Sequence, residues 1–182
     1  MPQPIPVELL AHSDSWARLA EIERGRLTEL LEVNLVAVHH IGSTAIPGIR
    51  AKPIIDLCPE VHVLSRLDEA RLQLCSLGYQ WWGEYGMRGR RYCTLDDQET
   101  QKRRVQLHCF ERGDPNIERH LAFRDYLKAH PHAAHEYEAV KIYARELHPD
   151  DSYAYSEAKS AWISAIESLA LTWFRSQHSS VS

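Results

Sequence analysis

Residues 40–60, HIGSTAIPGIRAKPIIDLCPE, contain a Gly-Ser pair, a lysine and an aspartate that could together bind a phosphorylated ligand. Gly42 lets the backbone approach a phosphate closely, and the Ser43 hydroxyl can donate a hydrogen bond to a phosphate oxygen. Asp56 could hold a Mg²⁺ ion that bridges phosphates, and Lys52 could add a positive charge. The pattern indicates a nucleoside triphosphate site, although a Gly-Ser pair taken alone more often marks a tight turn.

Asp56 lies between two apolar residues in a run that is typical of a buried strand. A carboxylate in that position is costly unless it meets a cation, a metal ion or backbone donors, which favours a functional role. His108 lies in a second apolar run, where it shares a face with Gln106 and Phe110. A ligand contact and a hydrogen-bonded structural histidine both fit that position. Strand alternation predicts that Asp56 and His108 point into the same cleft.

Short strands and helices must position these residues. Helical spacing predicts a helix over residues 13–34 with Ser13 as its N-cap, and another over residues 65–78 with a capping box of Ser65 and Asp68. Strands are predicted at four places: residues 35–41, 53–58, 91–95 and 104–110.

Pro59 is expected to end the second strand, and the last two strands are expected to form a hairpin. From residue 116 onward the pattern predicts three helices, with breaks at residues 130–131 and 149–152. These elements predict an α+β fold, a small mixed sheet backed by helices with a helical C-terminal part. They predict a single domain over residues 1–182.

Composition limits the classes of partner. The chain has 182 residues, 44% hydrophobic and 25% charged, and its net charge of −4 makes nucleic acid an unlikely partner. The four cysteines contain no C-x-x-C pair, so neither a zinc knuckle nor a disulfide framework is indicated. Because no apolar run reaches the length of a membrane span and the N-terminus does not resemble a signal peptide, we expect a cytoplasmic protein.

Several motifs together resemble one protein family. HIGSTAIPGIRAKPIID resembles the signature of the GrpB family, which is assigned to the nucleotidyltransferase superfamily. QLHCF, LAFRDYLKAHP and YAYSEAKSAWI resemble later motifs of that family, in the same order, and the resemblance covers roughly residues 35–165. It implies a nucleotidyltransferase fold in which Gly42 and Ser43 contact a triphosphate, carboxylates hold Mg²⁺, and Asp56 and His108 are catalytic.

The sequence departs from the superfamily pattern at the carboxylates. The resemblance implies two alternating carboxylates on one strand and a third on a later strand, but here Asp56 is followed by Cys58, and the third position is His108. A thiol is a soft ligand, ill suited to Mg²⁺. Restoring the pair with Cys58→Asp is therefore expected to strengthen Mg²⁺ binding, and Pro59 is expected to keep Glu60 out of the strand.

Five basic residues are candidates for a phosphate-binding pocket: Lys52, Arg90, Arg91, Arg124 and Lys159. Local alternatives exist for two of them, since Arg124 could pair with a neighbouring acid and Lys159 could be a solvated surface lysine.

Two function classes stay open. The first is a nucleotidyltransferase that uses Mg²⁺ and a small-molecule nucleotide. The second is a catalytically reduced module that binds a nucleotide or a coenzyme A precursor and acts through a protein partner. In some bacteria a GrpB-like domain is joined to dephospho-coenzyme A kinase, which fits either class.

Overall fold

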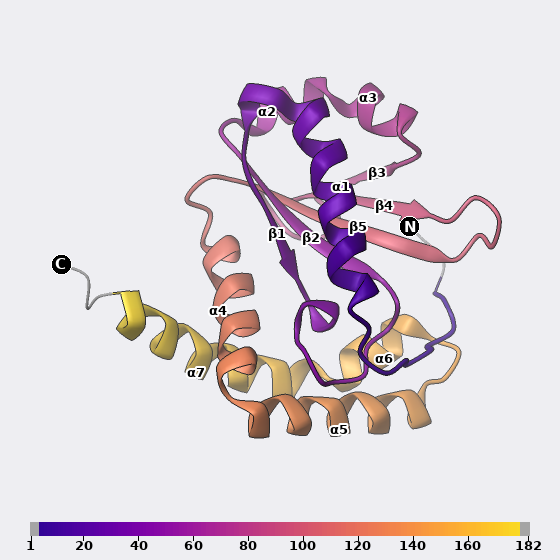
Figure 1. Ribbon diagram of the computed structural model, residues 1–182, viewed down its shortest axis with the longest axis vertical. Helices are drawn as coiled ribbons and strands as arrows, with labels where there is room; N and C mark the ends of the chain where they lie inside the picture. Colours follow the sequence, from indigo (N-terminus) through magenta and orange to yellow (C-terminus); the bar gives the residue numbers. More distant parts are fainter. Residues whose placement is uncertain (1–3, 179–182) are drawn as a thin grey trace. The chain divides into compact units, whose positions relative to one another are not determined.

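The computed structural model describes residues 4–178, and within that range the chain forms five strands and seven α-helices (Figure 1). The predicted α+β fold class is confirmed. Two compact units can be distinguished. The sheet unit comprises residues 13–45 and 54–117, and the helical unit comprises the residues up to 12, residues 46–53 and the residues from 118 onward. The single domain predicted over residues 1–182 stays a prediction.

The sheet unit is built on a mixed sheet with the strand order β1-β2-β5-β4-β3. Its strands are β1 (Leu35–Ile41), β2 (Ile55–Val61), β3 (Gln80–Gly83), β4 (Arg91–Asp96) and β5 (Arg103–Glu111). β2 and β5 pair in parallel, and the β1/β2, β4/β5 and β3/β4 pairs are antiparallel. The predicted hairpin is therefore confirmed as β4 and β5, and β2 and β5 lie side by side in the sheet.

Helix α1 (Ser15–Leu31) belongs to the sheet unit and continues into a short 3₁₀ turn at Glu32–Asn34. Its buried residues follow one another at intervals of about one helical turn and form a single stripe: Trp16, Ala20, Glu23, Leu27 and Leu31. Glu23 is the charged member of that stripe. It accepts a 2.6 Å hydrogen bond from the Tyr79 hydroxyl and a 3.0 Å bond from Arg26, so its carboxylate is paired although it is buried.

The second predicted helix, residues 65–78, is divided into α2 (Leu64–Glu69) and α3 (Arg71–Ser76). The predicted capping box is wrong, because the N-cap of α2 is Val63 and it makes no side-chain cap bond. Asp68 lies within α2 and accepts a 2.8 Å hydrogen bond from Arg91. The chain then forms β3, a four-residue strand that the sequence patterns missed.

β2 runs through Pro59 to Val61, so the prediction that this proline ends the strand is wrong. β2 lies between β1 and β5, and pairing on both sides holds the strand in place. Pairing with β5 is found on either side of the proline, at Leu57 with Leu107 and at Glu60 with Phe110. A missing N–H removes one ladder bond, but the flanking pairs keep the strand extended.

The helical unit contains four helices among the described residues where three were predicted: α4 (Pro115–Ala129, which starts in the sheet unit), α5 (Pro131–Leu147), α6 (Ser152–Ala158) and α7 (Ser160–His178). The two predicted breaks are found, and a third break falls at Lys159. Asp151 caps α6 by accepting from the amides of Tyr153 and Ala154, at 2.8 and 3.1 Å. No helix among residues 4–178 has the length and apolar character to cross a bilayer.

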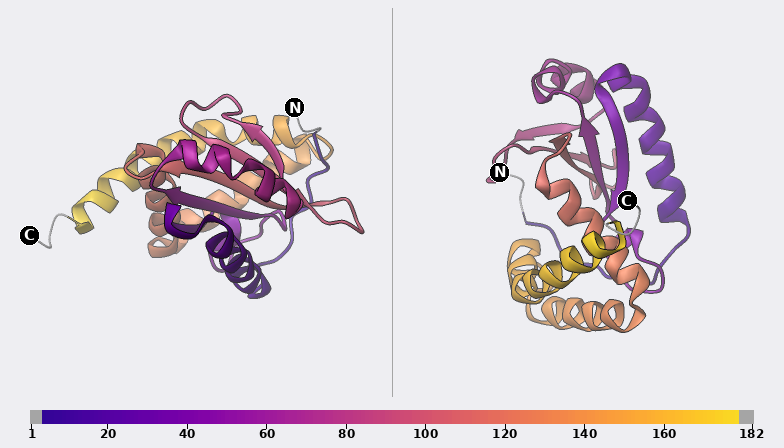
Figure 2. Two further views of the ribbon diagram at one scale, coloured as in Figure 1. Left: turned by 90° about the horizontal axis from the view of Figure 1, so that it is seen from above. Right: turned by 90° about the vertical axis from the view of Figure 1, so that its left-hand side faces the viewer.

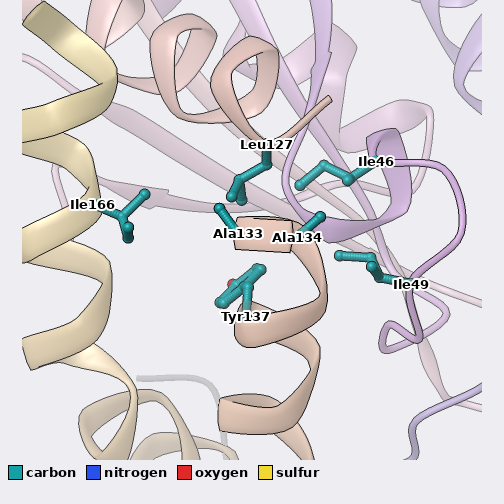
Figure 3. Packing of buried hydrophobic residues seen from close by; sticks show 7 residues of the cluster. All are labelled: Ile46, Ile49, Leu127, Ala133, Ala134, Tyr137 and Ile166. Carbon is teal, nitrogen blue, oxygen red and sulfur yellow. The ribbon is translucent and has the colours of Figure 1, made fainter. Parts of the chain in front are cut away.

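The core of the helical unit joins residues from α4, α5 and α7 to Ile46 and Ile49, which follow the Gly-Ser turn (Figure 3). Tyr137 lies in this core and stacks on Trp162, with ring centroids 5.1 Å apart. Figure 2 shows α5 and α7 from two further sides. The two isoleucines explain why the signature segment is apolar after Ser43: they are core residues, not ligand contacts.

Lys141 of α5 is a buried lysine, only 1% exposed, whose ammonium lies 4.7 Å from the Tyr137 ring centroid and donates to the Arg50 carbonyl. Burial lowers the pKa of Lys141 from its ordinary value of 10.5 to about 7, and the charge of Glu138 partly offsets this. Between these values the unfolded chain binds more protons than the folded chain at this residue.

The contribution of Lys141 to the free energy of unfolding should therefore increase as the pH rises above about 7, by up to ~1.4 kcal/mol per pH unit. We expect the Lys141→Met variant to lose this contribution. The free energy of unfolding of both proteins is measured with urea at several pH values from 6.5 to 9.5. The value for the variant is then subtracted from the value for the wild type. That difference should grow with pH, and a constant difference would show that Lys141 keeps an ordinary pKa in the folded protein.

Candidate functional site

Gly42 and Asp56 are in direct contact in the sheet unit. Gly42 has φ +70°, and a Cβ added there would lie 2.5 Å from Asp56 Oδ2. Ile41, at the end of β1, pairs with Asp56 near the start of β2, which places the carboxylate beside the turn that follows. Only glycine suits this position, because it tolerates positive φ and leaves room for the carboxylate.

Ser43 begins a short 3₁₀ turn, Ser43–Ala45, in which the Ala45 amide donates to the Gly42 carbonyl at 3.2 Å. The amides of Ser43 and Thr44 come before the first hydrogen bond of that turn, so the turn itself does not use them. The Thr44 hydroxyl is 2.9 Å from His40 Nε2, which anchors the turn to β1. The turn is thus held from both sides, by β1 and by the close packing of Asp56.

His108 lies on β5 with its Nε2 3.6 Å from Asp56 Oδ1. The two side chains are 17% and 26% exposed, so they are half-buried and reachable from solvent. They lie on one face of the sheet, as strand alternation predicted; that they point into a cleft stays a prediction. Their distance allows an ion pair when His108 is protonated.

Tyr92 completes this group and was missed by the sequence reasoning. It pairs with His108 across β4 and β5, and the two rings lie 5.3 Å apart. Burial raises the pKa of the Tyr92 hydroxyl, and the nearby charge of Asp56 raises it further. The only signal for Tyr92 in the sequence was its alternation in the hairpin strand, which needs the register before it points to His108.

Cys58 and Glu60 follow Asp56 on the same face of β2. Cys58 is fully buried, and Glu60 lies 3.3 Å from His39 and 3.8 Å from Arg112. Glu60 is four residues along the strand from Asp56, about 13 Å, too far to share a metal ion with it. No group of three or more His, Cys, Asp or Glu residues within the described part of the chain is placed to hold a metal ion.

Arg91 does not join this group. It pairs with Cys109 across the hairpin and therefore projects to the opposite face from Tyr92 and His108. There it donates to Asp68 at 2.5 and 2.8 Å, and this bond is the main reason that the pKa of Arg91 is raised. The structure thus separates Arg91 from Asp56, with which the sequence had grouped it.

Lys52, Arg124 and Lys159 belong to the helical unit. Lys159 and Lys52 both lie over the Tyr155 ring, with their Nζ atoms 4.0 and 5.3 Å from its centroid. The sequence had not predicted that they meet on one aromatic ring. Arg124 donates to its neighbour Asp125 at 2.7 Å, the local alternative considered for it. Contact of these three residues with a ligand at Asp56 stays a prediction.

Solved structures similar to this chain include GrpB and Cid1 structures. A structure of GrpB from Enterococcus faecalis superimposes with a TM-score of 0.86 at 34% identity, covering 92% of this chain and 99% of that one. Structures of the Cid1 poly(U) polymerase superimpose less closely, one of them with a TM-score of 0.58 at 15% identity, covering 81% of this chain and 50% of that one. At that identity the likeness shows a nucleotidyltransferase-like fold and no more.

Sequence relatives include UPF0157 and GrpB proteins. The chain is 40% identical to the UPF0157 protein YqkA of Bacillus subtilis over 92% of its length, but it spans only 48% of YqkA. It is 32% identical to the glutamate-rich protein GrpB of Alkalihalophilus pseudofirmus, covering 88% of this chain and 93% of that protein. A protein of Mycobacterium leprae named dephospho-CoA kinase is 29% identical, with this chain covering 45% of it.

The GrpB family model matches residues 6–168, which include the Gly-Ser turn, Asp56, His108 and both lysines over Tyr155. This match spans most of the chain. The protein belongs to the GrpB family.

Proposed function

We propose that this chain binds a nucleotide, or a related phosphorylated ligand, together with Mg²⁺ at Gly42, Ser43 and Asp56, and transfers a nucleotidyl group from it. The packing of the Asp56 carboxylate against the Gly42 turn carries the proposal. It puts a metal-binding oxygen beside backbone amides and a hydroxyl, the groups that a metal-bound phosphate needs. A purely structural turn would not require a half-exposed carboxylate at this spot.

The residues present fit one Mg²⁺ ion. Mg²⁺ is usually bound by one or two carboxylates and by the phosphates of the substrate, and it retains several waters. Asp56 would supply the carboxylate, and the ion would neutralise charge on the phosphates. With Cys58 in the second position and Glu60 about 13 Å away, the described side chains offer no second carboxylate to a metal beside Asp56.

His108 is the proposed catalytic base. The hydroxyl oxygen of the acceptor forms a bond to the α-phosphorus, the bond from that phosphorus to pyrophosphate breaks, and pyrophosphate leaves. The proton of the hydroxyl passes to His108, whose imidazole lies between Asp56 and Tyr92. A carboxylate at 3.6 Å stabilises the imidazolium that results.

A second candidate function follows from the Mycobacterium leprae relative, which is named for dephospho-CoA kinase. In that case the chain is a binding module for a coenzyme A precursor, without transfer chemistry, and acts through a partner. Cys58 in place of a second carboxylate favours this alternative, because two-metal transfer sites need more oxygen ligands.

A thermal-shift panel separates the two candidates. Each of the four nucleoside triphosphates, dephospho-coenzyme A and phosphopantetheine is added with and without Mg²⁺, since a ligand that binds only the folded state raises the melting temperature. Transfer requires a shift by a triphosphate that depends on Mg²⁺. The module requires a shift by a coenzyme A precursor instead, and a flat panel would contradict both.

The Cys58→Asp variant tests whether a second carboxylate at position 58 would strengthen Mg²⁺ binding. Because Cys58 is fully buried, an aspartate there should lower the melting temperature without metal, and Mg²⁺ with a non-hydrolysable triphosphate should restore it. We expect a Mg²⁺-induced shift larger than in the wild type. Cys58→Asn is the matched control of similar shape without charge. Equal Mg²⁺-induced shifts in the two variants would show that position 58 does not face the metal.

A further inference from the structure

A row of aromatic rings runs from His108 to the edge of the sheet. His108 is followed by Tyr92 at 5.3 Å, then by Tyr85 at 5.0 Å in a nearly parallel stack, and Trp82 of β3 lies 6.4 Å from Tyr85. These residues, called here the aromatic row, all belong to the sheet unit. One end of the row therefore lies at the Asp56 site and the other at the edge strand β3.

The loop that presents Tyr85 has a defined structure. Arg90 donates to the carbonyls of Glu84 and Tyr85, at 3.3 and 2.6 Å, and the Gly89 amide donates to Glu84 Oε1 at 2.7 Å. The Arg90 guanidinium also lies over the Tyr92 and Tyr85 rings, 5.0 and 5.9 Å from their centroids. Arg90 thus closes the loop and adds a planar cation to the row.

Tyr85 is held in an unfavourable backbone conformation. Its φ is +46°, a region where glycine or asparagine is far more common than tyrosine. Such residues cluster at ligand sites, where the surrounding structure keeps them in place. Stacking on Tyr92 supplies that support, and the Trp82 ring is fixed by a 2.8 Å bond from its Nε1 to the Thr94 hydroxyl.

Core packing accounts for only part of the row. Tyr92 is buried, but Tyr85 and Trp82 are half-buried, so both residues keep some contact with solvent. Aromatic faces next to an arginine are the surface on which nucleobases stack. Tyr85 and His108 are separated by two ring-to-ring steps of 5.0 and 5.3 Å, a separation comparable to the length of a nucleoside.

We propose that the aromatic row binds the nucleobase of a small nucleoside-type acceptor and directs its hydroxyl towards His108. This deepens the proposed function, on which the role of acceptor rests, whereas base stacking itself needs neither Mg²⁺ nor a triphosphate. A small acceptor is favoured over a nucleic acid strand because the chain has a net charge of −4.

The test uses the full chain without metal. Adenosine, guanosine, cytidine and uridine are titrated separately while the Trp82 indole N–H signal is followed by NMR, assigned by comparison with Trp82→Phe. At least one nucleoside should shift that signal. Tyr85→Gly should weaken its binding at least about 10-fold. Glycine suits the positive φ, so this variant removes the ring without straining the fold.

Three control variants show whether the effect of Tyr85→Gly comes from the loss of its aromatic ring. Tyr85→Phe keeps the ring and should bind like the wild type, as should Tyr143→Ala, which removes an exposed tyrosine of α5. Glu99→Gln, at an exposed residue of the hairpin, should also keep nucleoside binding, and because the titration contains neither Mg²⁺ nor a triphosphate, the row can be judged even if the metal-nucleotide proposal fails. The inference is overturned if no nucleoside shifts the Trp82 signal, if Tyr85→Gly binds normally, or if a single-stranded oligonucleotide of the same base binds at least tenfold more tightly than the nucleoside.

Discussion

Replacing Asp56 by asparagine should abolish Mg²⁺-dependent nucleotide binding and leave the protein folded. The amide has nearly the same shape, and the side chain is 26% exposed, so little packing is lost. The charge that would hold the metal is removed, and we expect at least a tenfold loss of affinity, about 1.4 kcal/mol, with Mg²⁺ present. Isothermal titration with a non-hydrolysable triphosphate measures it, with and without Mg²⁺.

Glu99→Gln is the control for loss of one negative charge, because this exposed residue lies in the hairpin between β4 and β5. It should bind as the wild type does. If Asp56→Asn kept the full Mg²⁺ dependence, Asp56 would not be the metal ligand. If Asp56→Asn unfolded while Glu99→Gln did not, the carboxylate would be needed for the fold.

Gly42→Ala should damage both stability and binding. Positive φ strains the alanine by about 1–3 kcal/mol. The new Cβ would also lie 2.5 Å from Asp56 Oδ2 and 3.1 Å from its Cγ, so the carboxylate must move. Unfolding by urea and titration of nucleotide measure the two effects.

Two comparisons separate the cost of backbone strain in Gly42→Ala from the cost of its steric clash with the Asp56 side chain. Gly113→Ala has a similar strain, at φ +88°, but a Cβ there meets no atom within 4 Å, so it should cost less and leave binding intact. In an Asp56→Ala background the carboxylate is absent and only the 3.0 Å contact with the Cβ of residue 56 remains, so Gly42→Ala should cost less stability than in the wild type. Equal costs in both backgrounds would show that the turn and the carboxylate are not coupled.

Local sequence patterns predicted the fold where one side of an element is buried. The apolar stripe of α1 and the alternation at Asp56 and His108 gave the helix, two central strands and the face that these two residues share. The patterns failed where tertiary contacts decide. Pro59 continues a strand because β2 lies between β1 and β5 and pairs with both, and Asp68 lies inside a helix that begins at Leu64, where it binds Arg91.

The candidate site was only partly predictable, because local patterns give contacts between residues near in sequence and not those that depend on the tertiary fold. The Gly-Ser turn and Asp56 are close in sequence, so their contact could be expected. Arg91 was grouped with them by charge alone, and only the register of β4 against β5 shows that it projects from the other face. Tyr92 and Tyr85 carried no recognisable motif, because their importance comes from rings that meet across a strand and a loop.

Paramagnetic NMR tests the central claim, that Asp56 and the Gly42 turn hold a metal-bound nucleotide, most directly. Mn²⁺ is added with a mixture of the four α,β-methylene nucleoside triphosphates, and signals near the bound metal broaden. We predict broadening of the His108 ring and of the Gly42 and Ser43 amides. The Val33 amide, beyond the far end of β1 and more than ~20 Å away, should stay sharp. Broadening should vanish in Asp56→Asn. Sharp His108 and Ser43 signals in the wild type, or the same broadening in Asp56→Asn, would contradict the proposed site.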